Sequence, residues 1–292
     1  MFIDIHVHAE SVPGHPGWDG KNTLASPEQL LEIYDAVGIE QGCVQPLGSP
    51  EIWAGPLSNQ EMLAIRDAYP DRFIPFCSVD PRAMTNSADA PLDSVLAFWK
   101  DKGCRGVGEV IANLPFLDPL VQNLFKHVES VGLPLTFHVA ARIGGTYGLY
   151  DEPGLPGLER SLRLFPKLNF LGHSHGFWAE IGRLRTPADR YIYPDYPIDE
   201  EGVVPELLRR YPNMLGDLSA GSGYNALARD PDYAVGFLNE FQDKLYFGTD
   251  ICRPNQPTPL VDFLIDLRDK GKITDEVFRK IARENAVRLL GL

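Results

Sequence analysis

Eight short β-like runs, most of them preceded by a helix-like segment, recur along the chain and constrain its fold more than any other feature. Strands that alternate with helices indicate βα units and a parallel sheet. Eight such units predict a (β/α)8 (TIM) barrel, an α/β fold that typically takes about 250 residues. We therefore expect one barrel domain over residues 1–292. The predicted strands are residues 2–7, 42–47, 73–79, 104–111, 133–139, 169–173, 213–219 and 245–250.

The predicted helices carry start and stop signals. Ser26 and Ser58 are each followed three residues later by Gln or Glu, the pattern of a helix N-cap. Glycines at the ends of apolar helical faces predict C-caps. These glycines are Gly38, Gly103, Gly132 and Gly271.

Two segments interrupt the alternation, residues 10–23 after the first strand and residues 177–204 after the sixth. The second is rich in Pro, Tyr and Asp over residues 190–197, a composition that regular elements accommodate poorly. Loops that follow barrel strands lie at the catalytic face. We therefore expect both insertions at the mouth of the barrel, with residues 190–204 covering the site.

Composition narrows the choice of partners. The formal net charge is −13, and no run of Lys and Arg long enough to follow a phosphate backbone is present. No apolar stretch is long enough to span a bilayer, and no signal peptide precedes the first strand. The four cysteines form no C-x-x-C pair, so we expect reduced thiols. These features favour a cytoplasmic enzyme with a small-molecule substrate and no nucleic-acid or membrane partner; a homodimer is possible.

Histidines gather at the ends of predicted strands. Five of the seven lie at or just past the C-terminal ends of strands one, five and six, which is the catalytic face of such a barrel. Asp250 closes strand eight, and Glu109 lies near the end of strand four. The five histidines are His6, His8, His138, His173 and His175.

The two histidines at the end of the first predicted strand, His6 and His8, predict a metal site. Alternate side chains of a strand point the same way, so His6 and His8 can bind one ion from a single segment. Neutral imidazole suits zinc and other borderline metals, and an added carboxylate leaves a position open for water or substrate. An isolated H-x-H motif is often structural, but further ligand types on three other strand ends favour a metal site. Asp4 lies two residues before His6, so the same alternation places it on their face of the strand, and we expect it to orient a ligand.

Three further residues are candidates for substrate binding. Arg142 lies just past His138 and Arg253 just past Asp250. The fork of donors on each guanidinium suits a substrate carboxylate, with a surface salt bridge as the alternative. His175 follows His173 by two residues and is expected either to contact substrate or to face a surface loop.

The order of these motifs resembles the amidohydrolase superfamily, and within it the branch that includes aminocarboxymuconate-semialdehyde decarboxylase. The resemblance implies a metal-dependent barrel enzyme in which His6, His8, His138 and Asp250 bind the metal. It also implies that His173 polarises the substrate or shuttles a proton. The motifs span nearly the whole chain, and they are residues 2–8 (FIDIHVH), 170–173 (FLGH), 247–250 (FGTD) and 284–292 (ENAVRLLGL).

Two departures from that branch leave alternatives open. The segment 106–109 (GVGE) is similar to the strand-four carboxylate that bridges two metals in other members, so Glu109 is a candidate ligand and the site holds one ion or two. His175 stands close to His173, so either imidazole can take the strand-six role. We favour His173, because it directly follows the apolar strand, and we favour one ion.

We expect a metal-dependent hydrolase that acts on a small, carboxylate-bearing amide, ester or lactone. Zinc is the first candidate metal and manganese the second. The ion lowers the pKa of bound water toward about 7, and Asp250 accepts the proton as general base. The alternative is non-oxidative decarboxylation, or hydration, of a small unsaturated or aromatic carboxylic acid. A non-catalytic barrel is disfavoured because every expected ligand position is filled.

Overall fold

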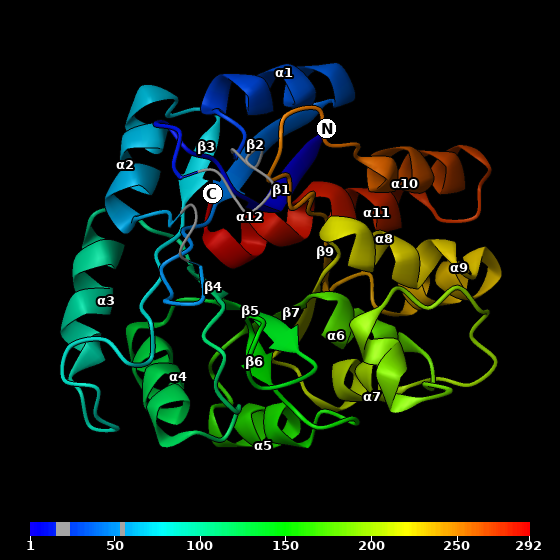
Figure 1. Ribbon diagram of the computed structural model, residues 1–292. Helices are drawn as coiled ribbons and strands as arrows, with labels where there is room; N and C mark the ends of the chain where they lie inside the picture. The colour runs from blue at the N-terminus through cyan, green and yellow to red at the C-terminus, as the bar shows by residue number, and fades with distance from the viewer. Residues whose placement is uncertain (16–23, 53–55) are drawn as a thin grey trace.

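The computed structural model describes residues 1–15, 24–52 and 56–292, and its helices surround a ring of parallel strands (Figure 1). The strands are β1 (Phe2–Val7), β2 (Ile39–Val44), β3 (Phe73–Pro75), β4 (Val107–Val110), β5 (Leu135–Ala140), β6 (Leu149–Tyr150), β7 (Phe170–His173), β8 (Met214–Asp217) and β9 (Leu245–Tyr246). The α-helices are α1 (Pro27–Val37), α2 (Asn59–Ala68), α3 (Leu92–Asp101), α4 (Pro119–Val131), α5 (Pro156–Leu164), α6 (His175–Trp178), α7 (Val203–Arg210), α8 (Ala220–Ala228), α9 (Pro231–Glu240), α10 (Pro259–Asp269), α11 (Asp275–Arg279) and α12 (Asn285–Leu290). Three short helical turns complete the set, namely η1 (Ala179–Ile181), η2 (Pro187–Tyr191) and η3 (Lys280–Glu284).

The strands close into a barrel. They form two parallel arcs, ordered β1-β2-β3 and β4-β5-β7-β8-β9, and a bridge between Cys77 and Val107 joins the arcs on one side. On the other side, the amide of Ile5 donates to the carbonyl of Phe247 at 3.0 Å. The short strand β6 pairs with β5, forms one further bridge from Tyr150 to Pro115, and lies outside the ring. The predicted (β/α)8 fold is therefore confirmed.

The predicted strands and the observed ones differ mainly at their ends. β1 has the predicted bounds, whereas β2 begins three residues before the predicted run 42–47. β3 ends at Pro75, after which the chain continues along the wall through separate backbone bonds, including one from Phe76 to Val44. β6 was not predicted, because a strand of two residues is too short to show an alternation of apolar and polar side chains.

Two of the four predicted C-cap glycines and both predicted N-caps are at the expected residues, whereas Gly103 and Gly271 each follow by one residue the C-caps Lys102 and Lys270. Ser26 forms a capping box with Gln29, and the hydroxyl of Ser58 accepts from the amide of Glu61. Gly38 and Gly132 end their helices in the left-handed region, with φ of 78° and 73°. In the described parts of the chain, no helix is long and apolar enough to cross a membrane.

Apolar side chains fill the part of the barrel away from the predicted site. Side chains from β1, β2, β3, β7, β8 and β9 form one buried cluster with two residues of α12, which lies across the centre of the ring in Figure 1. The cluster consists of Ile3, Ile5, Cys43, Ile74, Phe76, Leu171, Leu215, Tyr246, Ala286 and Leu290.

The long insertion after β7 is more regular than its composition predicts. Residues 187–191 form the turn η2, which begins with a capping box between Thr186 and Asp189, so the expectation of an irregular loop is wrong there. The hydroxyl of Tyr191 donates to the carbonyl of Ala141 at 3.0 Å, which places the insertion against the loop after β5 at the barrel mouth. The earlier insertion, 10–23, lies outside the described residues from position 16 onward.

Candidate metal centre

An irregularity in β1 decides which side chains face the centre of the barrel. Asp4 pairs with Gly42 and Val7 with Val44, so two residues of β1 stand opposite one residue of β2, as in a β-bulge. The bulge changes the simple alternation between Asp4 and His6. The two-residue spacing therefore does not place Asp4 on the same side of β1 as His6.

The carboxylate of Asp4 consequently accepts hydrogen bonds from backbone amides and a hydroxyl group, and not from an imidazole ring. Its carboxylate accepts the hydroxyl of Tyr34 on α1 at 2.7 Å and the backbone amide of Thr249 at 2.9 Å. It also accepts the backbone amide of His6 at 3.0 Å. Burial raises the pKa of Asp4 to about 6, against the lowering effect of these hydrogen bonds. Asp4 thus acts on the candidate ligand His6 through its backbone amide and not through its ring, and it holds the chain on both sides of the site.

The rings of His6 and His8 converge. Their Nε2 atoms lie 3.1 Å apart, and both side chains are buried. Nδ1 of His6 contacts the carboxylate of Asp217 at 2.7 Å, and Nδ1 of His8 contacts the carbonyl of Gln45 at 2.8 Å. Donation from each Nδ1 turns the two Nε2 atoms toward each other, so that either a proton on one of them or a bound cation satisfies both. Two nitrogens bound to one tetrahedral zinc at about 2.05 Å would be roughly 3.3 Å apart, close to the observed separation.

Asp217, at the end of β8, is the residue that the sequence analysis missed. It is fully buried, and its carboxylate accepts the backbone amide of Ser219 at 3.0 Å in addition to its contact with His6. Burial opposes ionisation of Asp217, but the charge and hydrogen bond of His6, together with His173 and Ser219, lower the pKa of the carboxyl below its ordinary value. Asp217 lies near the end of the predicted strand 213–219, so the rule that selected Asp250 could have selected it too.

Asp250 lies on the other side of the two imidazoles. Its Oδ1 is 3.5 Å from Nε2 of His8 and 3.9 Å from Nε2 of His6. The residue has a φ of 51°, in the left-handed region that is unusual for a side chain other than glycine. Its amide donates to the carbonyl of His6 at 2.8 Å, which holds this conformation. Burial raises the pKa of Asp250 to about 7, and the carboxylates of Glu109 and Asp217 contribute to the rise.

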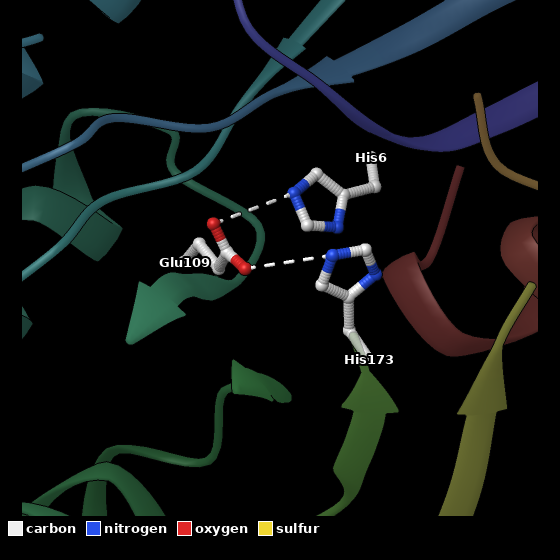
Figure 2. Close-up of side chains that lie close together, drawn as sticks. All are labelled: His6, Glu109 and His173. Carbon is white, nitrogen blue, oxygen red and sulfur yellow. Dashed lines mark ion pairs between the residues drawn. The ribbon is translucent and has the colours of Figure 1, made fainter. Parts of the chain in front are cut away.

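Glu109 of β4 lies between imidazoles of two other strands (Figure 2). Its Oε2 is 3.9 Å from Nε2 of His6, and its Oε1 is 3.6 Å from Nε2 of His173. Oε1 also contacts Nδ1 of His138 at 2.8 Å. Burial opposes ionisation, but the imidazoles of His138, His173 and His6 hold the pKa of Glu109 well below its ordinary value.

The ligand-type atoms form two groups that share His6. In each group the atoms lie within 4.8 Å of one another, and the groups are His6, His8 and Asp250, and His6, Glu109 and His173. His138, predicted as a ligand, belongs to neither of these groups and lies beside them, bonded to Glu109. It pairs in register with His173 across β5 and β7.

The two histidines of strand β7 and helix α6 have different surroundings. His173 is buried, with Nδ1 2.9 Å from the hydroxyl of Ser219 and Nε2 3.7 Å from Oδ2 of Asp250. Burial and the charge of His6 lower the pKa of His173 to about 3. His175 is half-buried at the start of α6, and its ring lies 5.9 Å from that of His138. Burial lowers its pKa to about 4. His173 therefore faces the carboxylates, and His175 lies nearer the rim.

The two predicted arginines lie on the exposed rim. Arg142 is exposed, and its guanidinium donates to the carbonyl of Gly145 at 3.3 Å. Arg253 is also exposed, in the segment after Asp250. The structure brings neither guanidinium into contact with the described carboxylates of the centre.

The charges of the centre favour a bound cation. Three carboxylates, Glu109, Asp217 and Asp250, meet around His6. Burial alone lowers the pKa of His6, but Asp217 and then the other two carboxylates raise it to about 10. The neighbouring His8 has a pKa lowered to about 4, by burial and by the charge of His6. A divalent cation at the converging Nε2 atoms would replace the proton of His6.

The whole chain matches one family at the sequence level. Residues 3–292 match the sequence model of the family described as amidohydrolase. No curated protein matches the chain.

Solved structures with similar folds cover nearly all of the chain. A 2,6-dihydroxybenzoate decarboxylase from Rhizobium has a TM-score of 0.60 at 18% identity, over 99% of this chain and 98% of that one. An amidohydrolase from Burkholderia multivorans with bound zinc has a TM-score of 0.65 at 14% identity, over 100% and 99% of the two chains. A probable 2-pyrone-4,6-dicarboxylic acid hydrolase from Acinetobacter baumannii has a TM-score of 0.58 at 17% identity, over 100% and 99%. At these identities the likeness concerns the fold alone.

Proposed function

The chain belongs to the amidohydrolase family, and from this premise we propose that it is a metal-dependent hydrolase of a small, carboxylate-bearing amide, ester or lactone. One observation carries the proposal, the convergence of Nε2 of His6 and of His8, 3.1 Å apart, with carboxylate oxygens within 3.9 Å. Imidazoles with a carboxylate and an open position form the ligand set of catalytic zinc sites. Zinc is therefore the first candidate metal, and manganese is the second.

We propose that His6, His8 and Asp250 hold a single ion, with Glu109 beside them and one position left open for water or substrate. In this arrangement His138 orients Glu109 through their 2.8 Å contact instead of binding the ion itself. Asp217 and the carbonyl of Gln45 fix the two ligand rings from behind. When bound, the ion supplies a Lewis acid that polarises a carbonyl and lowers the pKa of water toward about 7.

The residues around the ion provide a route for the proton. Asp250, whose pKa lies near 7 in the metal-free protein, takes the proton of the attacking water and returns it to the leaving group. His173 is neutral, and we assign its Nδ1 as acceptor from the hydroxyl of Ser219, which leaves an N–H at Nε2. That N–H faces the carboxylates and can donate to the carbonyl oxygen of a substrate held between them.

Decarboxylation is the second candidate. The relative from Rhizobium is named as a 2,6-dihydroxybenzoate decarboxylase, and the ligand types proposed here suit a bound substrate carboxylate equally well. In that reaction His173 would have to deliver a proton to a substrate carbon. A hydratase of an unsaturated acid is a further variant on the same residues.

A product screen tests the proposal. Purified protein loaded with zinc or manganese is assayed on amides, esters, lactones and aromatic carboxylic acids, with acid release and carbon dioxide release recorded separately. We expect acid release without carbon dioxide, and the double variant His6→Ala/His8→Ala should lose most of the metal and the activity. Carbon dioxide release would assign the second candidate. Full activity in the double variant would contradict a metal enzyme of either kind.

A further inference from the structure

Four aromatic rings form a row that begins and ends with exposed tyrosines and passes beside the metal centre at His138. The ring of Tyr147 lies 4.7 Å from that of His138, which lies 5.9 Å from that of His175, which lies 6.5 Å from that of Tyr193. We call these four residues the aromatic wall. The aromatic wall is fixed at the centre through His138, which contacts Glu109 at 2.8 Å.

The aromatic wall is assembled from separate elements. His138 lies in β5, Tyr147 in the loop between β5 and β6, His175 at the start of α6, and Tyr193 just after η2. The hydrogen bond from Tyr191 to the carbonyl of Ala141 joins the last of these segments to the loop after β5. The two segments are therefore held against each other at the mouth.

The same two segments expose an unusual share of apolar surface. Of the twelve large hydrophobic side chains that are exposed in the described part of the chain, five belong to residues 143–147 and 191–193. Clustered apolar exposure marks a surface that binds a ligand or a partner. Its position beside the metal centre favours a substrate. The five residues are Ile143, Tyr147, Tyr191, Ile192 and Tyr193.

The two tyrosines of the aromatic wall also have hydroxyl groups available. Within residues 1–15, 24–52 and 56–292, the hydroxyls of Tyr147 and Tyr193 form no hydrogen bond, whereas that of the neighbouring Tyr191 is bonded. The ring of Tyr147 lies beside that of His138, and the ring of Tyr193 lies beside that of His175. A phenol keeps its proton at neutral pH and can donate it to a substrate oxygen.

We propose that the aromatic wall binds a planar ring of the substrate, and that Tyr147 and Tyr193 donate hydrogen bonds to its oxygen atoms. The substrate class is then an aromatic or conjugated ring compound, such as a lactone fused to an aromatic ring, and not an aliphatic ester or amide. Offset stacking and edge contacts with aromatic side chains favour such rings over saturated ones of the same size. This inference rests on the proposed function, of which it names the substrate class.

A matched pair of substrates tests the inference. Isochroman-3-one and δ-valerolactone are both six-membered lactones of primary alcohols, and only the first carries a fused benzene ring. With the zinc-loaded enzyme we expect kcat/KM to favour isochroman-3-one by about tenfold or more. Tyr147→Ala and Tyr193→Ala should each remove most of that preference, because both lactones lose the hydrogen bond from the hydroxyl but only isochroman-3-one also loses the contact with the ring.

Conservative variants separate the hydroxyl from the ring. Tyr147→Phe and Tyr193→Phe keep the ring and should lower kcat/KM for isochroman-3-one by about three- to tenfold. Tyr150→Phe is the matched control, because the hydroxyl of Tyr150 bonds to Glu152 at 2.6 Å and its ring is not part of the aromatic wall. Equal preference for both lactones in the wild type, or unchanged selectivity in all four wall variants, would overturn the inference.

A binding measurement distinguishes failure of this inference from failure of the proposed function. If neither lactone is turned over, the hydrolase assignment for such substrates fails, and coumarin is titrated calorimetrically into the zinc-loaded protein. Binding by the wild type and by Tyr150→Phe that weakens about tenfold in Tyr147→Ala and Tyr193→Ala would support the aromatic wall. Absent binding in the wild type, or equal binding in folded wall variants, would refute it.

Discussion

Replacing Asp217 by Asn tests the reasoning about the metal centre most directly. The substitution keeps the shape of the side chain and leaves an amide oxygen that can accept from Nδ1 of His6. It removes the charge that lies 2.7 Å from that nitrogen in a fully buried position. Since the proposed ion binds to the other nitrogen of the same ring, the variant should bind zinc more weakly without losing a ligand.

The size of the effect follows from the geometry. Loss of a partner behind a ligating histidine typically costs about 10- to 100-fold in metal affinity, or about 1.4–2.8 kcal/mol. The upper half of that range applies here, because the contact is short, buried and charged. Oδ2 of Asp217 also lies 3.5 Å from Nδ1 of His173, so its charge acts on two rings. We expect the zinc affinity of Asp217→Asn to fall by roughly 30- to 100-fold.

Competition with a chromogenic chelator at neutral pH measures this affinity, and circular dichroism checks that each variant is folded. Asp151→Asn is the control, because Asp151 is also buried but accepts the backbone amides of Gly157 and Leu158. The control should bind zinc as the wild type does. Wild-type affinity in folded Asp217→Asn, or an equal loss in Asp151→Asn, would refute the account.

Two further predictions concern the ion count and a charged network of the rim. His173→Asn should keep one zinc per chain by elemental analysis while turnover falls by about a hundredfold or more; two ions in the wild type, falling to one, would instead make Glu109 a bridging ligand. Burial opposes ionisation of Glu51, but hydrogen bonds from Arg82 and Ser49 lower its pKa from 4.5 to about 2. A lowered folded pKa stabilises the protein above the unfolded value, and this stability is lost as the pH falls through about 2. Glu51→Gln should therefore be less stable than the wild type in urea at neutral pH, with a difference that shrinks below roughly pH 4; a constant difference would contradict this.

The sequence by itself predicted the barrel and the residues of its rim. Eight alternating units specify a closed parallel sheet, and the carboxyl ends of such strands all meet at one face. His6, His173 and Asp250 therefore had to lie near one another whatever the details of the loops. The match to the amidohydrolase family over residues 3–292 agrees with the resemblance found from the motifs.

The contact that each polar atom makes was not readable from the sequence. The family resemblance implied that His138 is a ligand, whereas in the structure its Nδ1 contacts Glu109 at 2.8 Å and it stands outside both groups of converging ligand atoms. Glu109 itself stands among three imidazoles. A strand position determines the face on which a side chain lies, but the rotamer and the neighbouring strand decide which atom it contacts.

Only the tertiary structure decided the roles of Asp4 and Asp217. The bulge in β1 adds one residue against β2, and such a change of register belongs to the pair of strands and leaves no signal in the alternation of either. Asp217 contacts His6 across a separation of 211 residues, so no local pattern connects them. Periodicity along one strand could select the residues of the rim, whereas their partners depend on how distant strands come together when the barrel closes.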